Sequence, residues 1–306
     1  MTQVDPLSMW NAGDAKETIL RFVLGTTLKG SETYVPPLER IAVFDNDGTL
    51  WVEQPYYTQL RFALDRTREL AADHPEWQTD ATLKAALDND ISSIAAQGMA
   101  GVAKIVAASH AGITTEELAQ AVRDWIESAR HPRFRRLYTE LIFQPQLQLI
   151  RFLREHDYRT YIVSGGGVEF MRAWSQDVYG IPPEQVVGSS AKTVFEMRNG
   201  RGVLVQLPEI DLVDDGPGKP VGINKYVGRR PTIAVGNSDG DMEMLQYATT
   251  GDGPSLGVYI HHDDAEREYA YDRHAVCGGL DKGIEEAAKR NWLVVSMQND
   301  WNQIFS

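Results

Sequence analysis

Cysteine, long apolar runs and excess positive charge are all scarce in this sequence of 306 residues. A single cysteine, Cys277, excludes an intrachain disulfide and suits a reducing compartment. No window approaches the roughly 18 consecutive apolar residues that a membrane-spanning helix needs. The formal net charge is -13 and no Lys/Arg-rich block is present, which argues against nucleic acid or an anionic membrane surface as the main partner.

The composition is that of a soluble globular protein. Hydrophobic residues make up 42% and charged residues 24% of the chain, enough for one large or two modest cores. The N-terminal stretch has no basic segment followed by an apolar run, so we expect no secretory signal and a cytoplasmic location. None of these features indicates an oligomeric state.

Alternating strand and helix patterns predict an α/β fold. Helical patterns such as Val168–Val178 separate short apolar runs that lack strict alternation, as strands covered on both faces do. This order favours a Rossmann-like, doubly wound parallel sheet with helices on both sides. The predicted strands are Ile41–Phe44, Thr160–Val163, Thr232–Val235, Leu256–Ile260 and Trp292–Val295.

Amphipathic helical patterns, uninterrupted by any strand pattern, fill the segment from about Pro55 to Leu141. We therefore predict an inserted all-helical cap. A hairpin is predicted at Val194–Leu207, where Asn199-Gly200 separates two strand-like runs. The predicted domains are an α/β core of residues 1–54 and 142–306, with residues 1–35 as an N-terminal helical extension, and a helical cap of residues 55–141.

Two aspartates follow the first predicted strand, in the sequence IAVFDNDGTLW. Ligands of open parallel sheets bind beyond the carboxyl ends of the strands, where Asp45 and Asp47 would lie. Two carboxylates so close repel each other and are costly to desolvate unless a cation compensates. Mg²⁺ prefers oxygen ligands, usually one or two carboxylates with waters and a substrate phosphate. The pair therefore indicates a magnesium site, with an ordinary Asp-rich turn as the alternative.

The same pair suits phosphoryl transfer. Asp45 can attack a phosphoryl group and form an aspartyl-phosphate, which splits a difficult transfer into two easier steps. Asp47 can give a proton to the leaving oxygen and later take one from water. We expect burial and the neighbouring negative charge to raise the pKa of Asp47.

Polar groups also follow two further predicted strands. Ser164 and Gly165 follow the second strand, and a hydroxyl with backbone N–H groups before a helix is what a phosphate seeks. The loop GNSDGD, at residues 236–241, follows the third strand, and its oxygens can complete a metal shell or simply cap a helix. Lys219 opens a short helical stretch before this loop and can neutralise phosphate and nucleophile together.

Taken in order, these segments resemble the four motifs of the haloacid dehalogenase superfamily. The resemblance covers about residues 40–260. The helical insertion after the first motif, together with the hairpin, is similar to the phosphoserine-phosphatase-like branch with a helical C1-type cap. The four matching segments are DNDGT at Asp45–Thr49, Ser164, Lys219 and GNSDGD at residues 236–241.

The resemblance implies a role for each of these residues. Asp45 would be the nucleophile and a Mg²⁺ ligand. Asp47 would be the acid and base and would bind the metal through its backbone carbonyl. Ser164 and Lys219 would hold the transferring phosphoryl group.

The fourth motif departs from the family pattern at Asn237, where a carboxylate usually follows the glycine. An amide oxygen can still ligate Mg²⁺ but brings no charge, so either the ion binds more weakly or Asp239 or Asp241 takes over. We keep Asn237 and Asp241 as predicted ligands, with Asp241 acting directly or through water. Lys225 is a weaker rival to Lys219.

The sequence leaves the substrate open. Phosphoserine phosphatases carry a glutamate nine residues after the nucleophile, where this chain has Gln54 beside Glu53. The segment 261–264, HHDD, favours a loop with a helix cap over a metal cluster, because adjacent histidines on a strand point to opposite faces. The other side chains that could reach a substrate, or could simply pack or be solvated, are Trp51, Tyr56, Tyr57, Arg133, Arg135 and Arg136.

We expect a Mg²⁺-dependent phosphatase that hydrolyses a small phosphorylated metabolite through an aspartyl-phosphate. Two alternatives stay open, a C–halogen hydrolase of the same superfamily and a non-catalytic phosphate-binding or scaffold protein. Asp47 argues against the first alternative, because halide leaves without an acid. Asn237 is the only hint of the second.

Overall fold

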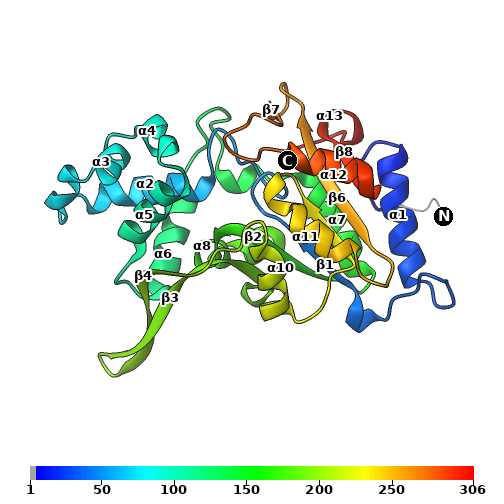
Figure 1. Cartoon of the computed structure of the whole chain (residues 1–306), viewed down its shortest axis with the longest axis horizontal. Coiled ribbons are helices and arrows are strands. Elements are labelled where there is room, and N and C mark those ends of the chain that lie inside the picture. The colour runs from blue at the N-terminus through cyan, green and yellow to red at the C-terminus, as the bar shows by residue number, and fades with distance from the viewer. Residues whose placement is uncertain (1–4) are drawn as a thin grey trace.

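The computed structural model describes residues 5–306 and contains an eight-stranded sheet (Figure 1). The strand order is β4-β3-β2-β1-β5-β6-β7, and β8 pairs with β6. The strands are β1 (Ile41–Phe44), β2 (Arg159–Gly167), β3 (Val186–Arg198), β4 (Arg201–Leu212), β5 (Ile233–Gly236), β6 (Leu256–Asp263), β7 (Ala270–Tyr271) and β8 (Leu293–Ser296).

Parallel pairing dominates the middle of the sheet. β1 lies between β2 and β5 and runs parallel to both, and β6 continues the parallel order next to β5. The carboxyl ends of β2, β1 and β5 therefore lie side by side at one edge. The predicted doubly wound α/β sheet is confirmed, and the segments that follow these three strands meet as the predicted site requires.

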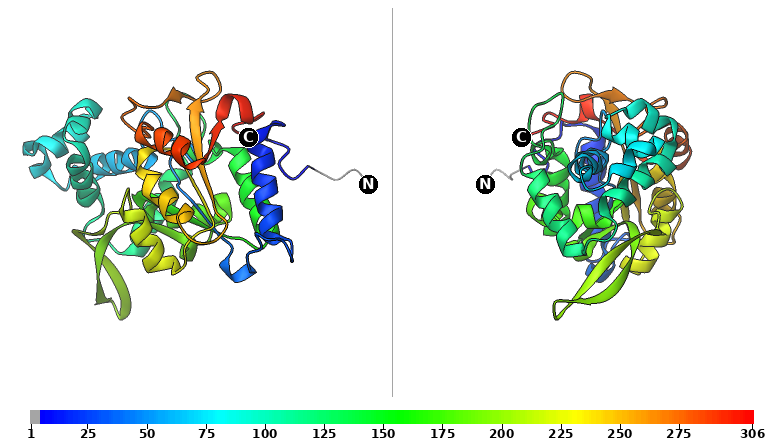
Figure 2. Two further views of the ribbon diagram at one scale, coloured as in Figure 1. Left: turned by 45° about the vertical axis from the view of Figure 1, so that its right-hand side comes forward. Right: turned by 90° about the vertical axis from the view of Figure 1, so that its left-hand side faces the viewer.

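Helices cover both faces of the sheet. Along β1, Ala42 and Phe44 join one hydrophobic cluster, whereas Ile41 and Val43 join a second. All four side chains are fully buried, which explains why this run lacks polar alternation. Figure 2 shows α1 and α7 on one side of the sheet and α11 and α12 on the other.

The helices around the sheet are mostly short. Within residues 5–306, no helix is long and apolar enough to span a membrane. The helices around the sheet are α1 (Asp14–Thr27), α7 (Gln144–Glu155), α8 (Val168–Arg172), α9 (Ser175–Tyr179), α10 (Gly218–Gly222), α11 (Met242–Thr249), α12 (Lys282–Arg290) and α13 (Met297–Asp300).

The segment inserted after β1 is helical, as predicted, and its role as a cap stays a prediction (Figure 1, cyan). Its outer helices share a hydrophobic cluster of their own that includes Leu64, Trp77 and Ile105. The last helix packs on the main core instead, through Leu118 and Val122. The helices are α2 (Thr58–Leu70), α3 (Ala81–Leu87), α4 (Ile91–Ala96), α5 (Gly98–His110) and α6 (Thr115–Ile126).

The chain enters and leaves this helical segment side by side. Val52 N–H donates to the Leu141 carbonyl at 3.1 Å, and Phe143 N–H donates to the Leu50 carbonyl at 2.9 Å. These bonds hold the two connecting stretches together directly after the DNDGT segment.

The hairpin is longer than the predicted Val194–Leu207. β3 and β4 together run from residue 186 to residue 212, and the outer part of this hairpin projects beyond the core (Figure 1, green). The turn is placed as predicted, because Asn199 and Gly200 have φ angles of 52° and 78°. Positive φ at both positions matches the twist of a two-residue hairpin.

Two local predictions are wrong in detail. The predicted helix Val168–Val178 is broken, because α8 ends at Arg172 and α9 begins at Ser175. β2 extends through the glycines to Gly167, with a register shift after Ser164 in its pairing with β3. The glycines thus form an irregular strand end that lies directly before α8, which begins at Val168.

Candidate active site

Asp45, Lys219 and Asp241 form a buried ion cluster at the carboxyl end of β1. Lys219 Nζ lies 2.7 Å from Asp45 Oδ1 and 2.5 Å from Asp241 Oδ1. It also donates to the Val163 carbonyl at 3.0 Å. The backbone of β5 fixes the start of this segment, since Asp45 N–H donates to the Val235 carbonyl at 2.9 Å. We use the name ion cluster below for the three charged side chains.

The ion cluster carries more negative charge than its single ammonium offsets. Burial raises the pKa of Asp45 well above its ordinary value, Asp241 raises it further, and Lys219 opposes this rise only in part. Burial alone would lower the pKa of Lys219, but the two carboxylates outweigh burial and raise that pKa, so the ammonium stays charged. A further cation beside Asp45 would reduce the cost of burying two carboxylates.

Asp47 lies just beyond Asp45, and a tryptophan fixes its orientation. Trp51 Nε1 donates to Asp47 Oδ1 at 2.9 Å, and the Trp51 ring stacks on Trp174 with 4.4 Å between centroids. Burial raises the pKa of Asp47, and the hydrogen bond from Trp51 offsets part of the rise. A carboxyl group with a raised pKa retains its proton at higher pH, which is what a general acid needs.

The backbone turns sharply after Asp47, at Gly48, whose φ is 75°. A Cβ at this position would lie 2.2 Å from Asn237 Nδ2, so the turn needs glycine. The buried Asn237 side chain accepts a hydrogen bond from Thr49 Oγ1 at 3.0 Å and donates to Glu53 Oε1 at 2.7 Å. These bonds hold the fourth predicted segment against the first.

Glu53 is a buried carboxylate that the sequence did not assign to the site. The Tyr271 hydroxyl donates to Glu53 Oε1 at 2.7 Å. Burial raises the pKa of Glu53 well above its ordinary value, and the Tyr271 bond opposes this rise in part. The only sequence signal was its place beside the expected glutamate position, because Tyr271 lies 218 positions further along the chain.

Asp241 supports the loop 236–241 with both of its carboxylate oxygens. Oδ2 accepts from Asn237 N–H at 2.9 Å and from Ser238 N–H at 3.0 Å, while Oδ1 contacts Lys219. Asp241 thereby positions both the loop and the lysine.

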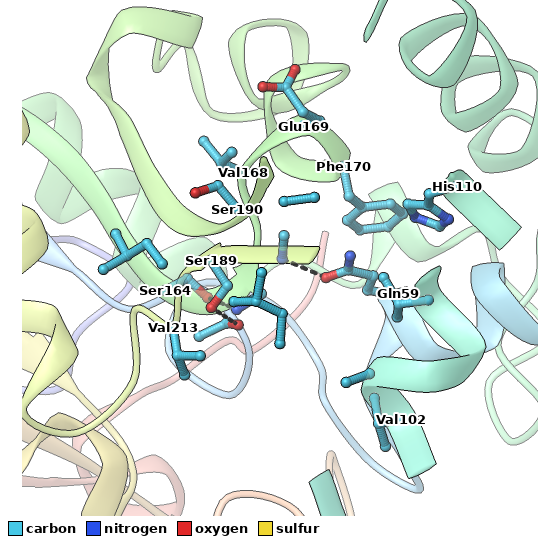
Figure 3. Close-up of a pocket in the computed structure, with 18 of the residues that line it drawn as sticks. Gln59, Val102, His110, Ser164, Val168, Glu169, Phe170, Ser189, Ser190 and Val213 are labelled. Carbon is cyan, nitrogen blue, oxygen red and sulfur yellow. Dashed lines mark hydrogen bonds between the residues drawn. The ribbon is translucent and has the colours of Figure 1, made fainter. Parts of the chain in front are cut away.

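A cavity of about 300 Å³, drawn in Figure 3, is lined by Asp45 and Lys219 of the ion cluster and by residues of the inserted helices. Two of the predicted metal ligands, Asn237 and Asp241, are buried beneath its floor and do not line it. The predicted site residues that do line it are Asp45, Asp47, Ser164, Gly165 and Lys219.

Side chains from two other elements hold the glycines beside Ser164 (Figure 3). Ser189 Oγ on β3 donates to the Gly165 carbonyl at 2.8 Å. Gly167 N–H donates to Gln59 Oε1 on α2 at 2.6 Å. Gln59 was missed from sequence, because its partner belongs to a distant strand end that only the folded chain brings near.

Other acidic and basic candidates lie away from the ion cluster. Asp239 caps α12, since its carboxylate accepts hydrogen bonds from the backbone N–H groups of residues 281–283. Lys225 is exposed and lies 3.6 Å from Asp211, so Lys219 is the lysine that reaches the carboxylates.

Several side chains that the sequence suggested as substrate contacts bond to backbone carbonyl groups outside the cavity instead. Arg133 donates to the carbonyl groups of residues 265, 266 and 268, and Arg136 donates to the Glu140 carbonyl at 3.0 Å. Gln54 Nε2 donates to the Cys277 carbonyl at 3.0 Å. The cavity lining includes none of these three side chains, and it also lacks Arg135 among the described residues.

The aromatic and histidine candidates have distinct positions. Trp51 contacts Asp47 as described, and Tyr57 lines the cavity, whereas Tyr56 lies outside its lining. The segment 261–264 was predicted as a loop with a helix cap, which is wrong, because β6 continues through Asp263. His262 is buried and His261 is partly exposed, since neighbours on a strand point to opposite faces.

Solved structures that match the chain support the fold. One is a conserved functionally unknown protein from Anaerococcus prevotii DSM 20548, with 16% identity, a TM-score of 0.57, and coverage of 92% of this chain and 90% of that chain. Another is a protein of unknown function from Bordetella pertussis Tohama I, with 16% identity, a TM-score of 0.54, and coverage of 84% and 98%. No curated protein matches the chain.

A match to a protein-family model identifies the family to which the core belongs. The model of haloacid dehalogenase-like hydrolases matches residues 42–246, which is more than half of the chain. The matched range runs from β1 through the loop at residues 236–241, so it includes every residue of the ion cluster. The chain therefore belongs to the haloacid dehalogenase-like hydrolase family.

Proposed function

We propose that the chain is a Mg²⁺-dependent phosphatase that hydrolyses a small phosphomonoester through an aspartyl-phosphate on Asp45. The arrangement at the cavity floor carries this proposal. There a buried carboxylate, Asp45, lies beside a charged Lys219, and Asp47 lies next to them with a raised pKa. A protonated acid serves an alkoxide leaving group and is not needed for a halide.

The donors at the floor fit a hard divalent cation. They are oxygen atoms, and the carboxylates of Asp45, Asp47 and Asp241 outnumber the ammonium of Lys219. Across residues 5–306, no three His, Cys, Asp or Glu side chains converge as a metal site. An ion here would thus need amide, main-chain, phosphate or water oxygens in addition, which is how Mg²⁺ is usually held.

Three residues of the chain would hold the ion. They are Asp45 through its carboxylate, Asp47 through its main-chain carbonyl and Asn237 through its amide oxygen. Asp241 would hold the loop at residues 236–241 and the Lys219 ammonium in position. When bound, Mg²⁺ supplies positive charge that neutralises phosphoryl oxygens.

The first step is attack of an Asp45 carboxylate oxygen on phosphorus. The P–O bond to the leaving alcohol breaks, and Asp47 gives its proton to that oxygen. The ionised Asp47 then takes a proton from water, whose oxygen attacks phosphorus and releases Asp45 and inorganic phosphate. Lys219 and Ser164 offset charge on the non-bridging oxygens, because transition-state charge is spread over them.

The test is release of inorganic phosphate from p-nitrophenyl phosphate by the full chain, with Mg²⁺ and with EDTA. We expect turnover only with Mg²⁺. Replacement Asp45→Asn should lower kcat by about 10³-fold or more, because it removes the nucleophile. Replacement Asp211→Asn, at a surface carboxylate that pairs with Lys225, is the matched control and should leave kcat unchanged.

Three outcomes would contradict the proposal. Equal turnover with EDTA would reject the metal. Chloride release from a 2-chloroacid, without phosphate release from any ester, would favour the C–halogen hydrolase. Absence of turnover on a broad phosphoester panel would favour a non-catalytic protein.

A further inference from the structure

The walls of the cavity above the ion cluster are largely apolar. The inserted helices α2 and α5 contribute one side, and α8 with the end of the hairpin and the segment after it contributes another (Figure 3). The apolar side chains on which the argument rests are Leu60, Val102, Val106, Phe170, Ile210 and Val213.

Positive charge is confined to the floor of the cavity. Lys219 is the only lysine or arginine among the described lining residues, and its ammonium already contacts Asp45 and Asp241. His110 also lines the cavity, but burial lowers its pKa to about 4, so the ring is neutral at pH 7. A second anionic group on a substrate would therefore meet no free cation.

The wall carboxylates would repel such a group. An ammonium would gain little from them, because two are already paired and the other two, Glu209 and Asp215, are exposed to water that screens their charge. Glu169 already pairs with Arg172 at 3.1 Å. Glu53 already accepts hydrogen bonds from Tyr271 and Asn237. The carboxylates in the lining other than Asp45 and Asp47 are Glu53, Glu169, Glu209 and Asp215.

We propose that the leaving alcohol of the substrate is uncharged and mainly apolar, without a second phosphate, a carboxylate or an ammonium group. This inference rests on the phosphatase function proposed above. Apolar walls favour burial of hydrocarbon, whereas a charge moved there without a partner loses its hydration uncompensated. Neutral polar side chains such as Gln59, Ser190 and Gln206 also line the cavity and can bind a hydroxyl group. Phosphoserine, with its amine and carboxylate, falls outside this class.

Three esters of equal chain length test the proposal: n-hexyl phosphate, 6-(phosphonooxy)hexanoate and 6-aminohexyl phosphate. The full chain with Mg²⁺ should show the highest kcat/KM for n-hexyl phosphate, by on the order of tenfold or more over each charged ester. A kcat/KM for either charged ester that equals or exceeds that of n-hexyl phosphate would overturn the proposal.

A variant with a new cation in the wall sharpens the test. Val106→Arg places a guanidinium on α5 at the cavity, and should raise kcat/KM for 6-(phosphonooxy)hexanoate relative to n-hexyl phosphate by about tenfold. Ala100→Arg, at an exposed position of the same helix, is the matched control and should leave the ratio unchanged. Circular dichroism of both variants checks that they fold, and an unchanged ratio in a folded Val106→Arg would contradict the proposed placement of the alcohol.

Binding separates a failure of this inference from a failure of the proposed function. The three esters are titrated into Asp45→Asn by calorimetry, which reads affinity without turnover. If p-nitrophenyl phosphate and all three esters resist hydrolysis by the wild type, the phosphatase function fails. In that case the tightest binding by n-hexyl phosphate would still support an uncharged, apolar ligand for the cavity, whereas equal or tighter binding of a charged ester would refute it.

Discussion

Asn237 and Glu53 share a buried hydrogen bond, with 2.7 Å between Asn237 Nδ2 and Glu53 Oε1. The residue that departs from the family motif is thus paired with a carboxylate from the segment that follows Asp45 and Asp47. An aspartate at position 237 would place two carboxylates at this distance. The amide can donate a hydrogen bond to this neighbour, whereas an ionised aspartate cannot.

We expect Asn237→Asp to destabilise the metal-free protein at pH 8 by about 1–3 kcal/mol, because it removes a buried donor and adds a like charge. The double variant Asn237→Asp with Glu53→Gln should recover most of the loss, since the new amide can donate to the new carboxylate. Urea unfolding in EDTA measures both. If the double variant is no more stable than Asn237→Asp alone, the pairing does not explain the amide.

Lys219 is expected to be a main support of the fold around the site. Lys219→Met keeps the length of the side chain but leaves Asp45 and Asp241 buried without their cation. We expect a loss of about 3–5 kcal/mol in the free energy of unfolding at pH 7 without Mg²⁺. The exposed Lys225→Met is the control. Equal effects of the two substitutions in urea unfolding would contradict the role of the buried ion pairs.

We expect the buried, neutral His110 to make the protein less stable as the pH falls. Its folded-state pKa of about 4 lies below the ordinary value of 6.5, so between these values the unfolded chain binds more protons and stability falls as pH falls. The expected loss is at most about 3 kcal/mol between pH 7 and pH 4. The variant His110→Phe should show a smaller loss over this range in urea unfolding. The exposed His274→Phe should keep the wild-type slope, and a wild-type slope in His110→Phe would contradict the assignment.

For Asp214 we expect the opposite dependence of stability on pH. Burial raises its pKa to about 7, and its two carboxylate oxygens have no hydrogen-bond partner among the described residues. Its contribution to stability is therefore present below pH 3.8 and is lost as pH rises through about 7. The stability of Asp214→Asn relative to the wild type should increase between pH 5 and pH 8, by at most about 3 kcal/mol. Thermal unfolding of the variant and the wild type at pH 5 and pH 8 measures this gain. An equal stability difference between the two proteins at both pH values would refute the prediction.

The sheet and the floor of the site were predictable because their signals are local. A strand that is buried on both faces reads as an apolar run, and Asp45 and Asp47 follow it directly. Parallel order then places Ser164 and the loop at residues 236–241 at the same edge.

The support around that floor was not predictable in the same way. Glu53 is recognised only through its contacts with Asn237 and Tyr271, and Gln59 only through Gly167. These contacts join positions far apart in the chain, and no spacing pattern encodes them. The outer part of the hairpin was predicted, but its inner ends, at residues 186–193 and 208–212, were missed, because the pairing of β3 with β4 shifts register there and leaves no regular alternation.

The paired stretches at Leu50–Val52 and Leu141–Phe143 have a consequence for how such proteins can diversify. All of the inserted helices lie between two anchor points that the core itself holds together. A recombination event that exchanged this one contiguous stretch of the gene would leave Asp45 and Asp47 untouched and would replace the part of the cavity wall that the inserted helices contribute. Under the function proposed above, reactivity and selectivity can therefore be inherited separately.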